Sequence, residues 1–390
     1  MRILLLHNYY QQAGGEDVVV EQEKALLQSK GHDVQLLSAH NDSIANLRAR
    51  IKAAVAISYS RQSRTLVSDK LQAFRPDVVH VHNFFPLLSP SVYYVCSESR
   101  VPVVQTLHNF RLICPSTLLY RAGRPCESCV GKKFAWPAVV HRCYRGSYVG
   151  SASLAAMLSS HKAAGTWSTK VNAYIALTTF AREKLIEGGI PPDRLHVKPN
   201  FVLADPGCGT HEGGFALFVG RLSPEKGVRT LLSAWSRLQQ PIKLKIVGDG
   251  PLRSDVESTA AANSMIEVLG SRSAEYVKEL MKSATFLVFP SECFEAFGRV
   301  IVEAFATGLP VIAGRIGSVP ELIADGRTGF LFEPGKPDEL ARCVMHAFKS
   351  LCTLKTMSTF AREEYREKYT GDKNYQQLMH IYDLARATAS

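Results

Sequence analysis

One stretch, residues 286–321, limits most strongly what this chain can fold into, and it reads FLVFPSECFEAFGRVIVEAFATGLPVIAGRIGSVPE. The apolar run 286–289 predicts a buried parallel strand, and Pro290 ends it. Residues 299–306 predict a helix, and residues 311–313 predict the next strand. Two parallel strands joined by a crossover helix form a βαβ unit, which packs helices against a parallel sheet. The stretch therefore predicts an α/β fold.

The same order of short strands and helices recurs in both halves of the chain. Residues 2–7 and 34–37 predict strands on either side of a helix at 17–30. Residues 215–220 open the second half with a further strand. The sequence therefore predicts two Rossmann-like domains that face each other across a cleft. The dinucleotide fingerprint G-x-G-x-x-G is absent after the first strand.

Composition predicts the domain limits. Residues 1–198 form the first domain, with a cysteine-rich insert at 110–148, and residues 215–370 form the second. Residues 199–214 are rich in Gly, Pro and polar residues without periodicity, which predicts a linker. The final segment, 371–390, predicts a helix with three apolar side chains that need burial: Leu378, Ile381 and Leu384.

Two carboxylates occupy special places in the stretch 286–321. Glu295 lies in the loop before the helix, and Glu303 follows eight residues later on a mostly apolar helix. Ligands of open α/β sheets bind at the carboxyl ends of strands, beside helix N-termini. A carboxylate can accept hydrogen bonds from two hydroxyls at once, as sugars and riboses present them. Taken alone, Glu295 could equally cap the helix and Glu303 could pair with a neighbouring arginine.

Other candidate groups also follow predicted strands. Arg221 and Lys226 lie in the loop between a strand and a helix, where two cations suit a diphosphate; the alternative is two solvated charges. Gly14 and Gly15 follow the first strand and would let a phosphate or an acceptor approach the backbone; the alternative is a plain turn.

Two histidines, His82 and His108, end the predicted strands 77–82 and 103–108. A site would form at these strand ends because ligands of α/β sheets bind there. A lone histidine in such a place is nevertheless more often structural than catalytic.

Four of the nine cysteines lie in the insert, with the spacing C-x11-C-x2-C-x13-C. Four thiolates can bind Zn²⁺ tetrahedrally in a closed, structural site. Two disulfides, an iron–sulfur cluster or unrelated free thiols are the alternatives, and without a secretory signal a reducing compartment is expected. The predicted zinc ligands are Cys114, Cys126, Cys129 and Cys143.

The net charge of +11 comes entirely from the first half of the chain. Residues 1–198 carry 24 Lys and Arg against 13 Asp and Glu, whereas residues 199–390 carry 22 of each. This asymmetry indicates an anionic partner, either a membrane surface, a lipid pyrophosphate or nucleic acid. Residues 46–74 predict a basic amphipathic helix suited to an anionic lipid surface; the alternative is a solvated helix that packs on the domain.

No run of 18 or more apolar residues and no signal-peptide cleavage site is present, so neither a transmembrane helix nor secretion is predicted. The insert adds basic and aromatic side chains suited to a headgroup interface. They are Arg121, Arg124, Lys132, Lys133, Arg142, Arg145, Trp136, Tyr144 and Tyr148.

The stretch 286–321 closely resembles the E-x7-E motif of the retaining glycosyltransferases of family 4, which have the GT-B fold. Phe297 and Gly298 follow the first glutamate as they do in that family, and the downstream segments GLPV and GSVPE also match. Residues 220–227, GRLSPEKG, match the family's G-R-L-x-x-x-K-G pattern. The resemblance covers most of the chain and is strongest over residues 215–333.

The resemblance implies roles for the residues of this stretch and of the cationic loop. Glu295 would hold hydroxyls of the donor sugar, and Glu303 would hold the nucleotide ribose. Arg221 and Lys226 would neutralise the donor diphosphate as it leaves.

The resemblance also implies roles for residues of the first domain. His108 would face the donor sugar, with His82 the weaker candidate. Gly14 and Gly15 would lie near the donor phosphate and the acceptor. The terminal helix would cross back onto the first domain.

The predicted function is retaining transfer of a hexose-type sugar from a nucleoside-diphosphate sugar to a hydroxyl acceptor. A lipid-linked glycan in surface-polysaccharide synthesis is the expected acceptor, and the enzyme is expected to be cytoplasmic, at the inner membrane face. No catalytic cofactor and no nucleic acid partner are expected. Two alternatives remain: a nucleotide-sugar epimerase of the same architecture, and a non-catalytic nucleotide-sugar binder.

Overall fold

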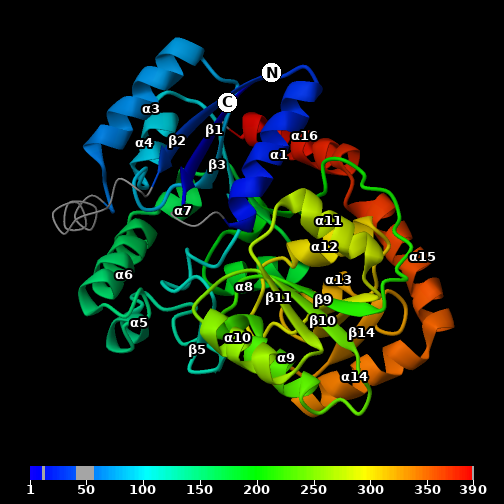
Figure 1. Cartoon of the computed structure of the whole chain (residues 1–390). Coiled ribbons are helices and arrows are strands. Elements are labelled where there is room, and N and C mark those ends of the chain that lie inside the picture. The colour runs from blue at the N-terminus through cyan, green and yellow to red at the C-terminus, as the bar shows by residue number, and fades with distance from the viewer. Residues whose placement is uncertain (11–13, 41–56, 389–390) are drawn as a thin grey trace. The chain divides into compact units, whose positions relative to one another are not determined.

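The computed structural model describes residues 1–10, 14–40 and 57–388 of the chain and divides it into two compact units. Unit 1 contains residues 1–119, 127–203 and 371–390, and unit 2 contains residues 120–126 and 204–370 (Figure 1). Each unit contains a six-stranded sheet in which all neighbouring strands are parallel. The predicted α/β class with two Rossmann-like domains is confirmed.

Unit 1 has the strand order β2-β1-β3-β4-β7-β8. The inner strands β1, β3, β4 and β7 are buried on both faces over most of their length, as their apolar runs require, whereas the edge strands β2 and β8 are mostly partly exposed. The strands are β1 (Arg2–Tyr9), β2 (Asp33–His40), β3 (Val78–Asn83), β4 (Val103–Leu107), β7 (Ala173–Ala176) and β8 (Leu195–Val197). The helices are α1 (Gly15–Ser29), α3 (Arg61–Phe74), α4 (Ser91–Glu98), α5 (Trp136–Val140), α6 (Tyr148–Ala163), α7 (Thr166–Thr169), α8 (Thr179–Glu187), η2 (Pro192–Arg194) and α16 (Gly371–Ala387).

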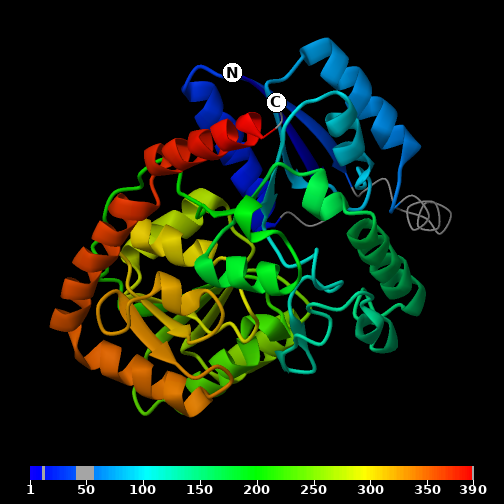
Figure 2. The same ribbon diagram turned by 180° about the vertical axis from the view of Figure 1, so that it is seen from behind.

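The terminal helix α16 belongs to unit 1 and lies beside α1, as Figures 1 and 2 both show. Leu378 and Ile381 are buried against the sheet, in one cluster with Ile3 and Leu5 of β1. Leu384 is instead 38% exposed. The helix therefore completes a hydrophobic core that begins with the first strand of the chain.

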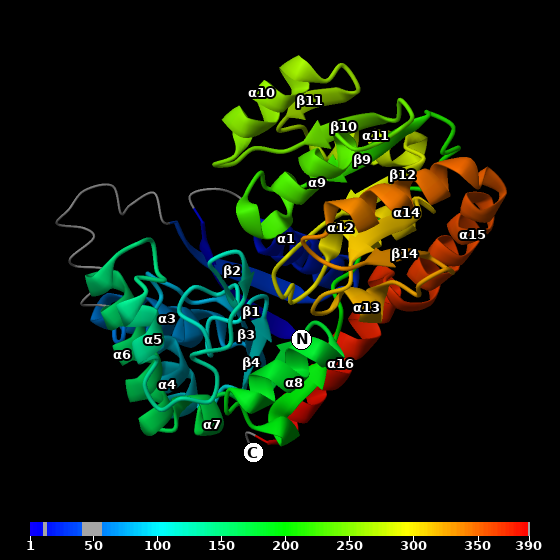
Figure 3. The same cartoon turned by 90° about the horizontal axis from the view of Figure 1, so that it is seen from below.

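Unit 2 has the strand order β11-β10-β9-β12-β13-β14. The strands from β11 to β12 can be followed in this order in Figure 3. The strands are β9 (Phe215–Val219), β10 (Lys243–Val247), β11 (Ile266–Gly270), β12 (Phe286–Phe289), β13 (Val311–Gly314) and β14 (Gly329–Phe332). The helices are η3 (Pro224–Lys226), α9 (Val228–Trp235), α10 (Arg253–Ala262), α11 (Ala274–Ser283), α12 (Arg299–Ala306), α13 (Val319–Leu322), α14 (Pro337–Lys349) and α15 (Leu351–Lys368). A hairpin from the insert, β5 (Tyr120–Arg121) and β6 (Arg124–Pro125), also belongs to unit 2.

Residues 204–214, predicted as part of a linker, are hydrogen-bonded along unit 2. The backbone N–H groups of Gly209, His211 and Gly213 donate to carbonyls at the ends of α11 and α12. The His211 ring also contacts the carbonyl oxygens of Ala284 and Thr307, at 3.2 and 3.0 Å. The glycines permit this close approach, because a Cβ on Gly209 would lie 2.1 Å from a backbone oxygen.

The basic segment 46–74 is described only in part, because residues 41–56 lie outside the described residues. Within the described part, α3 begins after Ser60, whose hydroxyl accepts a hydrogen bond from the Ser63 N–H. Val67 and Leu71 are buried, which agrees with packing of this helix on the domain. Among the described residues, no helix combines the length and the apolar character needed to cross a bilayer.

Candidate functional site

In each unit, the order of the strands identifies one place at the carboxyl ends of the strands where the loops after two neighbouring strands run in opposite directions. In unit 2, β9 lies between β10 and β12, so the chain leaves β9 toward one side and returns as β12 on the other. Loops that follow such neighbouring strands diverge, and the gap at their carboxyl ends is the usual ligand site of an open α/β sheet. The loop after β9 carries Arg221 and Lys226, and the loop after β12 carries Glu295.

Lys226 and Glu295 meet at this position although 69 residues separate them. The Lys226 Nζ donates to Glu295 Oε1 at 2.6 Å, and the Ser291 hydroxyl donates to the same oxygen at 2.7 Å. Burial alone would lower the pKa of Lys226, but the Glu295 carboxylate beside it raises that pKa above its ordinary value. A charged ammonium and a carboxylate therefore lie in contact at the carboxyl end of the sheet.

Two glycines allow the backbone of these loops to approach closely. Gly227 has a φ of 68°, and a Cβ there would lie 1.8 Å from the Pro290 carbonyl oxygen. Gly317 has a φ of 57°, and a Cβ there would lie 3.1 Å from the backbone nitrogen of Glu295. Only glycine adopts these left-handed conformations without cost in such confined space. The loop after β9 and the segment 317–321 thus pack directly against the Glu295 loop.

Two other predicted site residues of unit 2, Arg221 and Glu303, do not take part in the contact between Lys226 and Glu295. Arg221 is exposed, and no hydrogen bond or ion pair within the described residues holds its guanidinium. Glu303 lies on α12 and pairs with Arg299 one turn earlier, with both side chains partly exposed. The pairing of Glu303 with a neighbouring arginine, one of the two interpretations of the sequence, is therefore present in this structure.

Gly298 and Phe297 have structural roles in this structure. Gly298 is the N-cap of α12 and has no side chain to cap it. Glu295 contacts Lys226 and Ser291, which differs from the alternative in which it caps the helix. Phe297 is buried and packs edge-on against Tyr369, with ring centroids 6.3 Å apart.

Two neighbours of this site are not among the residues predicted from the sequence. Thr230 on α9 donates to Glu292 at 2.5 Å. Tyr120, from the β5–β6 hairpin, has a pKa raised to about 12 by burial and by the nearby charges of Glu292 and Cys293. The hairpin comes from the cysteine-rich insert, and no local signal in its sequence indicates that it would reach this loop.

In unit 1 the corresponding position lies between β1 and β3. Gly14 is the N-cap of α1, and its N–H donates to Asp17 Oδ2 at 2.7 Å. The other oxygen of Asp17 lies 2.7 Å from His7 Nε2. Asp17 and Glu16 both lie in the first turn of α1, so a phosphate near Gly14 and Gly15 would meet carboxylates as well as N–H groups.

Glu16 links this turn to the ends of the neighbouring strands. Its two carboxyl oxygens accept from the side-chain amides of Asn83 and Asn109, at 3.1 and 3.2 Å. Burial raises the pKa of Glu16, and the nearby His7 and Arg111 only partly offset this rise. The loops after β1, β3 and β4 are thereby joined by polar contacts at the carboxyl end of the sheet.

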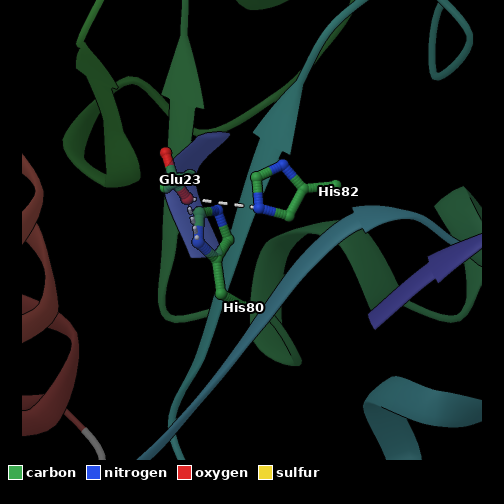
Figure 4. A group of neighbouring side chains, drawn as sticks. All are labelled: Glu23, His80 and His82. Carbon is green, nitrogen blue, oxygen red and sulfur yellow. Dashed lines mark ion pairs between the residues drawn. The ribbon is translucent and has the colours of Figure 1, made fainter. Parts of the chain in front are cut away.

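A buried cluster of ionisable side chains lies behind these loops. Glu23 Oε1 on α1 lies 3.0 Å from His80 Nδ1 and 3.2 Å from His82 Nε2, both on β3 (Figure 4). The other Glu23 oxygen accepts from Lys198 Nζ at 3.1 Å. Glu23 and Lys198 are each only 1% exposed, so this ion pair is shielded from water.

His82 also contacts His108, so the structure brings the two histidine candidates together. Their nitrogens Nδ1 and Nε2 are 3.0 Å apart, and the rings are stacked with centroids 5.3 Å apart. Burial lowers the pKa of His82 to about 3, and it lowers that of His108 well below its ordinary value. Both imidazoles are therefore neutral at physiological pH. Glu23 and Lys198 are not among the residues predicted from the sequence, because nothing in the sequence around either residue indicates that they are in contact.

The four predicted zinc ligands are divided between the units. Cys114, Cys129 and Cys143 belong to unit 1, and Cys126 belongs to unit 2. All nine cysteines lie within the described residues, and none forms a disulfide. Zinc at the four cysteines stays a prediction.

Two family models match consecutive parts of the chain. Residues 13–205 match the model described as Glycosyltransferase Family 4, and residues 214–350 match the model described as Glycosyl transferases group 1. Among curated proteins, an uncharacterized glycosyltransferase of Methanocaldococcus jannaschii is 33% identical over 171 residues, which are 43% of this chain and 48% of that protein. A sulfoquinovosyl transferase of Arabidopsis thaliana is 32% identical over 164 residues, which are 41% of this chain and 31% of that protein. The chain spans less than half the length of these two relatives.

Solved structures match over nearly the whole chain. HepE of Anabaena in complex with UDP has a TM-score of 0.70 at 18% identity, covering 98% of this chain and 100% of that chain. Sucrose-phosphate synthase of Thermosynechococcus elongatus has a TM-score of 0.73 at 16% identity, covering 100% of both chains. These similarities show that the fold is GT-B.

Proposed function

We propose, because the chain belongs to the group 1 glycosyltransferase family, that it transfers a sugar residue from a nucleoside-diphosphate sugar to a hydroxyl acceptor. Solved structures of the same fold include one with bound UDP and one with bound UDP-glucose, which supports a nucleotide-sugar donor. The observation that carries the proposal is the contact of Lys226 with Glu295 at the carboxyl end of the unit 2 sheet. The Lys226 ammonium suits a diphosphate, and the Glu295 carboxylate suits sugar hydroxyls.

The chemical step must stabilise a leaving group. The bond between the sugar C1 and the diphosphate oxygen breaks, and negative charge develops on the diphosphate. We place Arg221 and Lys226 against that charge, because preorganised cations stabilise it without reorganisation during the reaction. Arg221 is suited to this role since its exposed guanidinium has no partner within the described residues.

We propose retention at C1 through attack from the face that the diphosphate leaves. The acceptor oxygen forms the new bond to C1, and its proton passes to the departing diphosphate oxygen. In this proposal Glu295 holds donor-sugar hydroxyls, and Glu303 turns from Arg299 to accept hydrogen bonds from the ribose hydroxyls. A hexose is the proposed sugar.

The first test is a thermal-shift and hydrolysis screen with UDP-, GDP-, ADP- and dTDP-sugars. One nucleotide sugar at 100 times its dissociation constant is expected to stabilise the wild type by about 2.7 kcal/mol, which raises Tm by several degrees. Glu303→Ala should abolish this shift. Glu275→Ala is the matched control, because Glu275 also pairs within a helix, with Lys278, but on exposed α11.

The outcomes of this screen separate the proposal from its alternatives. Slow release of free sugar, or transfer to an added acceptor, supports a transferase. Conversion of one nucleotide sugar into another without an acceptor would indicate an epimerase, which the family does not favour. Tight binding with no turnover, even after acceptors are added, would indicate a non-catalytic binder.

For the acceptor side, we propose contact with an anionic membrane surface and a lipid-linked glycan acceptor in surface-polysaccharide synthesis. Helix α5 and the start of α6 expose several large apolar side chains, with Val149 at 72% and Tyr148 at 57%. Lys132, Lys133, Arg142 and Arg145 are exposed in the same segment, where Lys132 lies over the Trp136 ring and Arg142 over the Tyr148 ring. Residues 128–182 contain no Asp or Glu. Aromatic and basic groups together suit a headgroup region, at the inner face of the membrane in a cytoplasmic enzyme.

Vesicles that contain phosphatidylglycerol are expected to bind the protein at low salt. Replacing Trp136 and Val149 together with alanine should weaken this binding about tenfold, because both side chains lose apolar area that the lipid would cover. Leu351→Ala is the control, since Leu351 is 56% exposed on α15. Co-sedimentation measures the binding, and a wild type that stays in solution at low salt would contradict the proposal.

We also propose a structural zinc ion at Cys114, Cys126, Cys129 and Cys143. The C-x2-C pair at Cys126 and Cys129 has the spacing of zinc-binding knuckles, and thiolates are preferred Zn²⁺ ligands. Metal analysis of purified protein should give one zinc per chain, and Cys129→Ser should reduce it at least tenfold. The exposed Cys208 gives the control Cys208→Ser, which should keep its zinc. Zinc-free wild type that is folded and active would refute this site.

A further inference from the structure

Two loops at the carboxyl ends of β3 and β4 have the same local geometry. In the first, the side-chain oxygen of Asn83 accepts from the backbone N–H of Phe85 at 3.0 Å. In the second, the side-chain oxygen of Asn109 accepts from the backbone N–H of Arg111, also at 3.0 Å. These bonds fix the orientation of both amides, so each NH₂ group faces Glu16, whose two oxygens accept at 3.1 and 3.2 Å. One carboxyl group on α1 therefore holds both loops in place.

This arrangement stacks a cation on an aromatic ring. The Arg111 guanidinium lies over the Phe85 ring, 4.0 Å from its centroid, and Phe85 is 3% exposed. The ring attracts a guanidinium at this distance and holds it in one orientation. Arg111 Nη1 is buried and has no hydrogen-bond partner within the described residues, although the side chain as a whole is partly exposed. This N–H group therefore lacks an acceptor, which a ligand that reaches the exposed part of the guanidinium can supply.

Glu16 is a poor counter-ion for Arg111. Both of its carboxyl oxygens already accept from the two amides. Burial raises the pKa of Glu16 even though the nearby Arg111 lowers it, so this carboxyl group binds a proton more readily than an ordinary glutamate. The charge of Arg111 is therefore poorly balanced, and an anion fits it better than a neutral group. A phosphate suits it well, because a guanidinium donates two parallel hydrogen bonds to phosphate oxygens.

Aromatic rings and cations continue from this point to the turn between α5 and α6. The Tyr144 ring packs edge-on against Phe85, with centroids 5.9 Å apart, and the Arg145 guanidinium lies 5.6 Å from the Tyr144 centroid. Arg142, in the same turn, lies 5.2 Å from the ring centroid of Tyr148. Both arginines are exposed, beside the exposed apolar side chains of α5 and α6. Four side chains thus form a cation–aromatic row within unit 1: Arg111, Phe85, Tyr144 and Arg145.

We propose that the cation–aromatic row binds the phosphate or diphosphate group of a lipid, with the lipid chain directed toward the exposed apolar side chains of α5 and α6. The fixed guanidinium of Arg111 makes the specific contact, and the exposed Arg142 and Arg145 attract the anion by their charge. Apolar side chains at one end and cations along the row match an amphiphile whose phosphate follows its lipid chain. This inference rests on the proposed function, in which the acceptor is lipid-linked. It adds that the acceptor carries phosphate, and it names the residues of unit 1 that hold this group.

Binding of farnesyl diphosphate to the whole chain, measured by calorimetry without a nucleotide sugar, tests this proposal. The wild type should bind it about tenfold or more tightly than farnesol, which lacks the charge, and than inorganic pyrophosphate, which lacks the lipid chain. Arg111→Gln should weaken the binding about 10- to 100-fold, the usual worth of a hydrogen bond to a charged group. Equal binding by Arg111→Gln and the wild type would overturn the proposal. Pyrophosphate that binds as tightly as farnesyl diphosphate would also overturn it, because the site would then serve free phosphate.

A second variant and a control keep the test decisive if Arg111→Gln does not fold. Arg142→Gln combined with Arg145→Gln changes only exposed side chains and should weaken the binding of farnesyl diphosphate about tenfold. Arg327→Gln is the matched control and should bind as the wild type does. Arg327 also lies over an aromatic ring, 4.6 Å from the centroid of Phe360, but it belongs to unit 2. If the double variant and the control both bind as tightly as the wild type, the proposal is wrong.

Failure of this inference and failure of the proposed function give different results. The binding measurement requires no sugar transfer, so it reports on the cation–aromatic row even if no nucleotide sugar is turned over. If farnesyl diphosphate binds as expected and no nucleotide sugar is turned over, the proposed function fails and the lipid-phosphate site stands. If the wild type transfers sugar and Arg111→Gln binds farnesyl diphosphate as the wild type does, only this inference fails.

Discussion

Lys226→Met is expected to reduce kcat for sugar transfer about 100- to 1000-fold, the usual loss when one preorganised group against a developing negative charge is removed. Methionine keeps most of the length and apolar stem of lysine but has no charge. The ammonium is held at 2.6 Å by Glu295, so it is in place before the diphosphate begins to leave. The effect should fall mainly on kcat, because the charge to be neutralised grows in the transition state.

Lys245→Met is the matched control for this prediction. Lys245 has a side-chain exposure of 26% against 28% for Lys226, and it also lies near a glutamate, Glu267, at 3.7 Å. It lies on β10, away from the loops after β9 and β12. Steady-state kinetics on folded variants measure the effect. A loss confined to KM would show that Lys226 serves ground-state binding, and equal kcat values in both variants would contradict its catalytic role.

The parts of this structure that sequence could predict are local in the chain. Residues 286–313 were predicted as strand, loop, helix and strand, and they form β12, α12 and β13. The apolar runs predict the strands and the helix, and Pro290 and Gly308 mark where elements end. Each of these signals lies within a few residues of the element that it defines. The E-x7-E spacing placed Glu295 before α12 and Glu303 on it for the same reason.

The contacts that sequence could not predict join distant segments. Lys226 and Glu295 were both candidates, but nothing in either segment indicates that they touch. The pair of Glu23 and Lys198 depends on α1 packing near the end of β8, and 175 residues separate the two side chains. Amphipathic periodicity shows that α1 has a buried face, but it cannot show which polar group on that face meets a partner.

The boundaries of the two units also depend on contacts between residues that are far apart in the sequence. Residues 204–214 have linker composition, yet their backbone N–H groups find carbonyl partners at the ends of α11 and α12. Tyr120 lies in an insert with weak local signals, yet its hairpin belongs to unit 2. Composition reports how easily a segment bends, whereas tertiary hydrogen bonds decide what it packs against.

Lys198→Met is expected to lower the free energy of unfolding by about 3–5 kcal/mol, because it leaves the Glu23 carboxylate buried without a cation. Both side chains are 1% exposed, so water cannot replace the lost partner. The stabilisation by this ion pair depends on pH because the pKa of Glu23 is depressed in the folded protein. The stabilisation is fully present above the pKa of an unfolded Glu, about 4.3, and it is lost as the pH falls through the lower pKa of folded Glu23. The difference between wild type and Lys198→Met should therefore shrink in acid.

Urea unfolding at pH 7 and in acid measures this prediction. Lys30→Met is the control: Lys30 pairs with Asp372 at 2.6 Å, but these side chains are 36% and 77% exposed, so its loss should cost at most about 1 kcal/mol. The double variant Glu23→Leu with Lys198→Met should recover much of the loss, because removing both charges also removes the desolvation cost. A double variant as unstable as Lys198→Met would instead show that the lysine stabilises unit 1 through packing rather than through its charge.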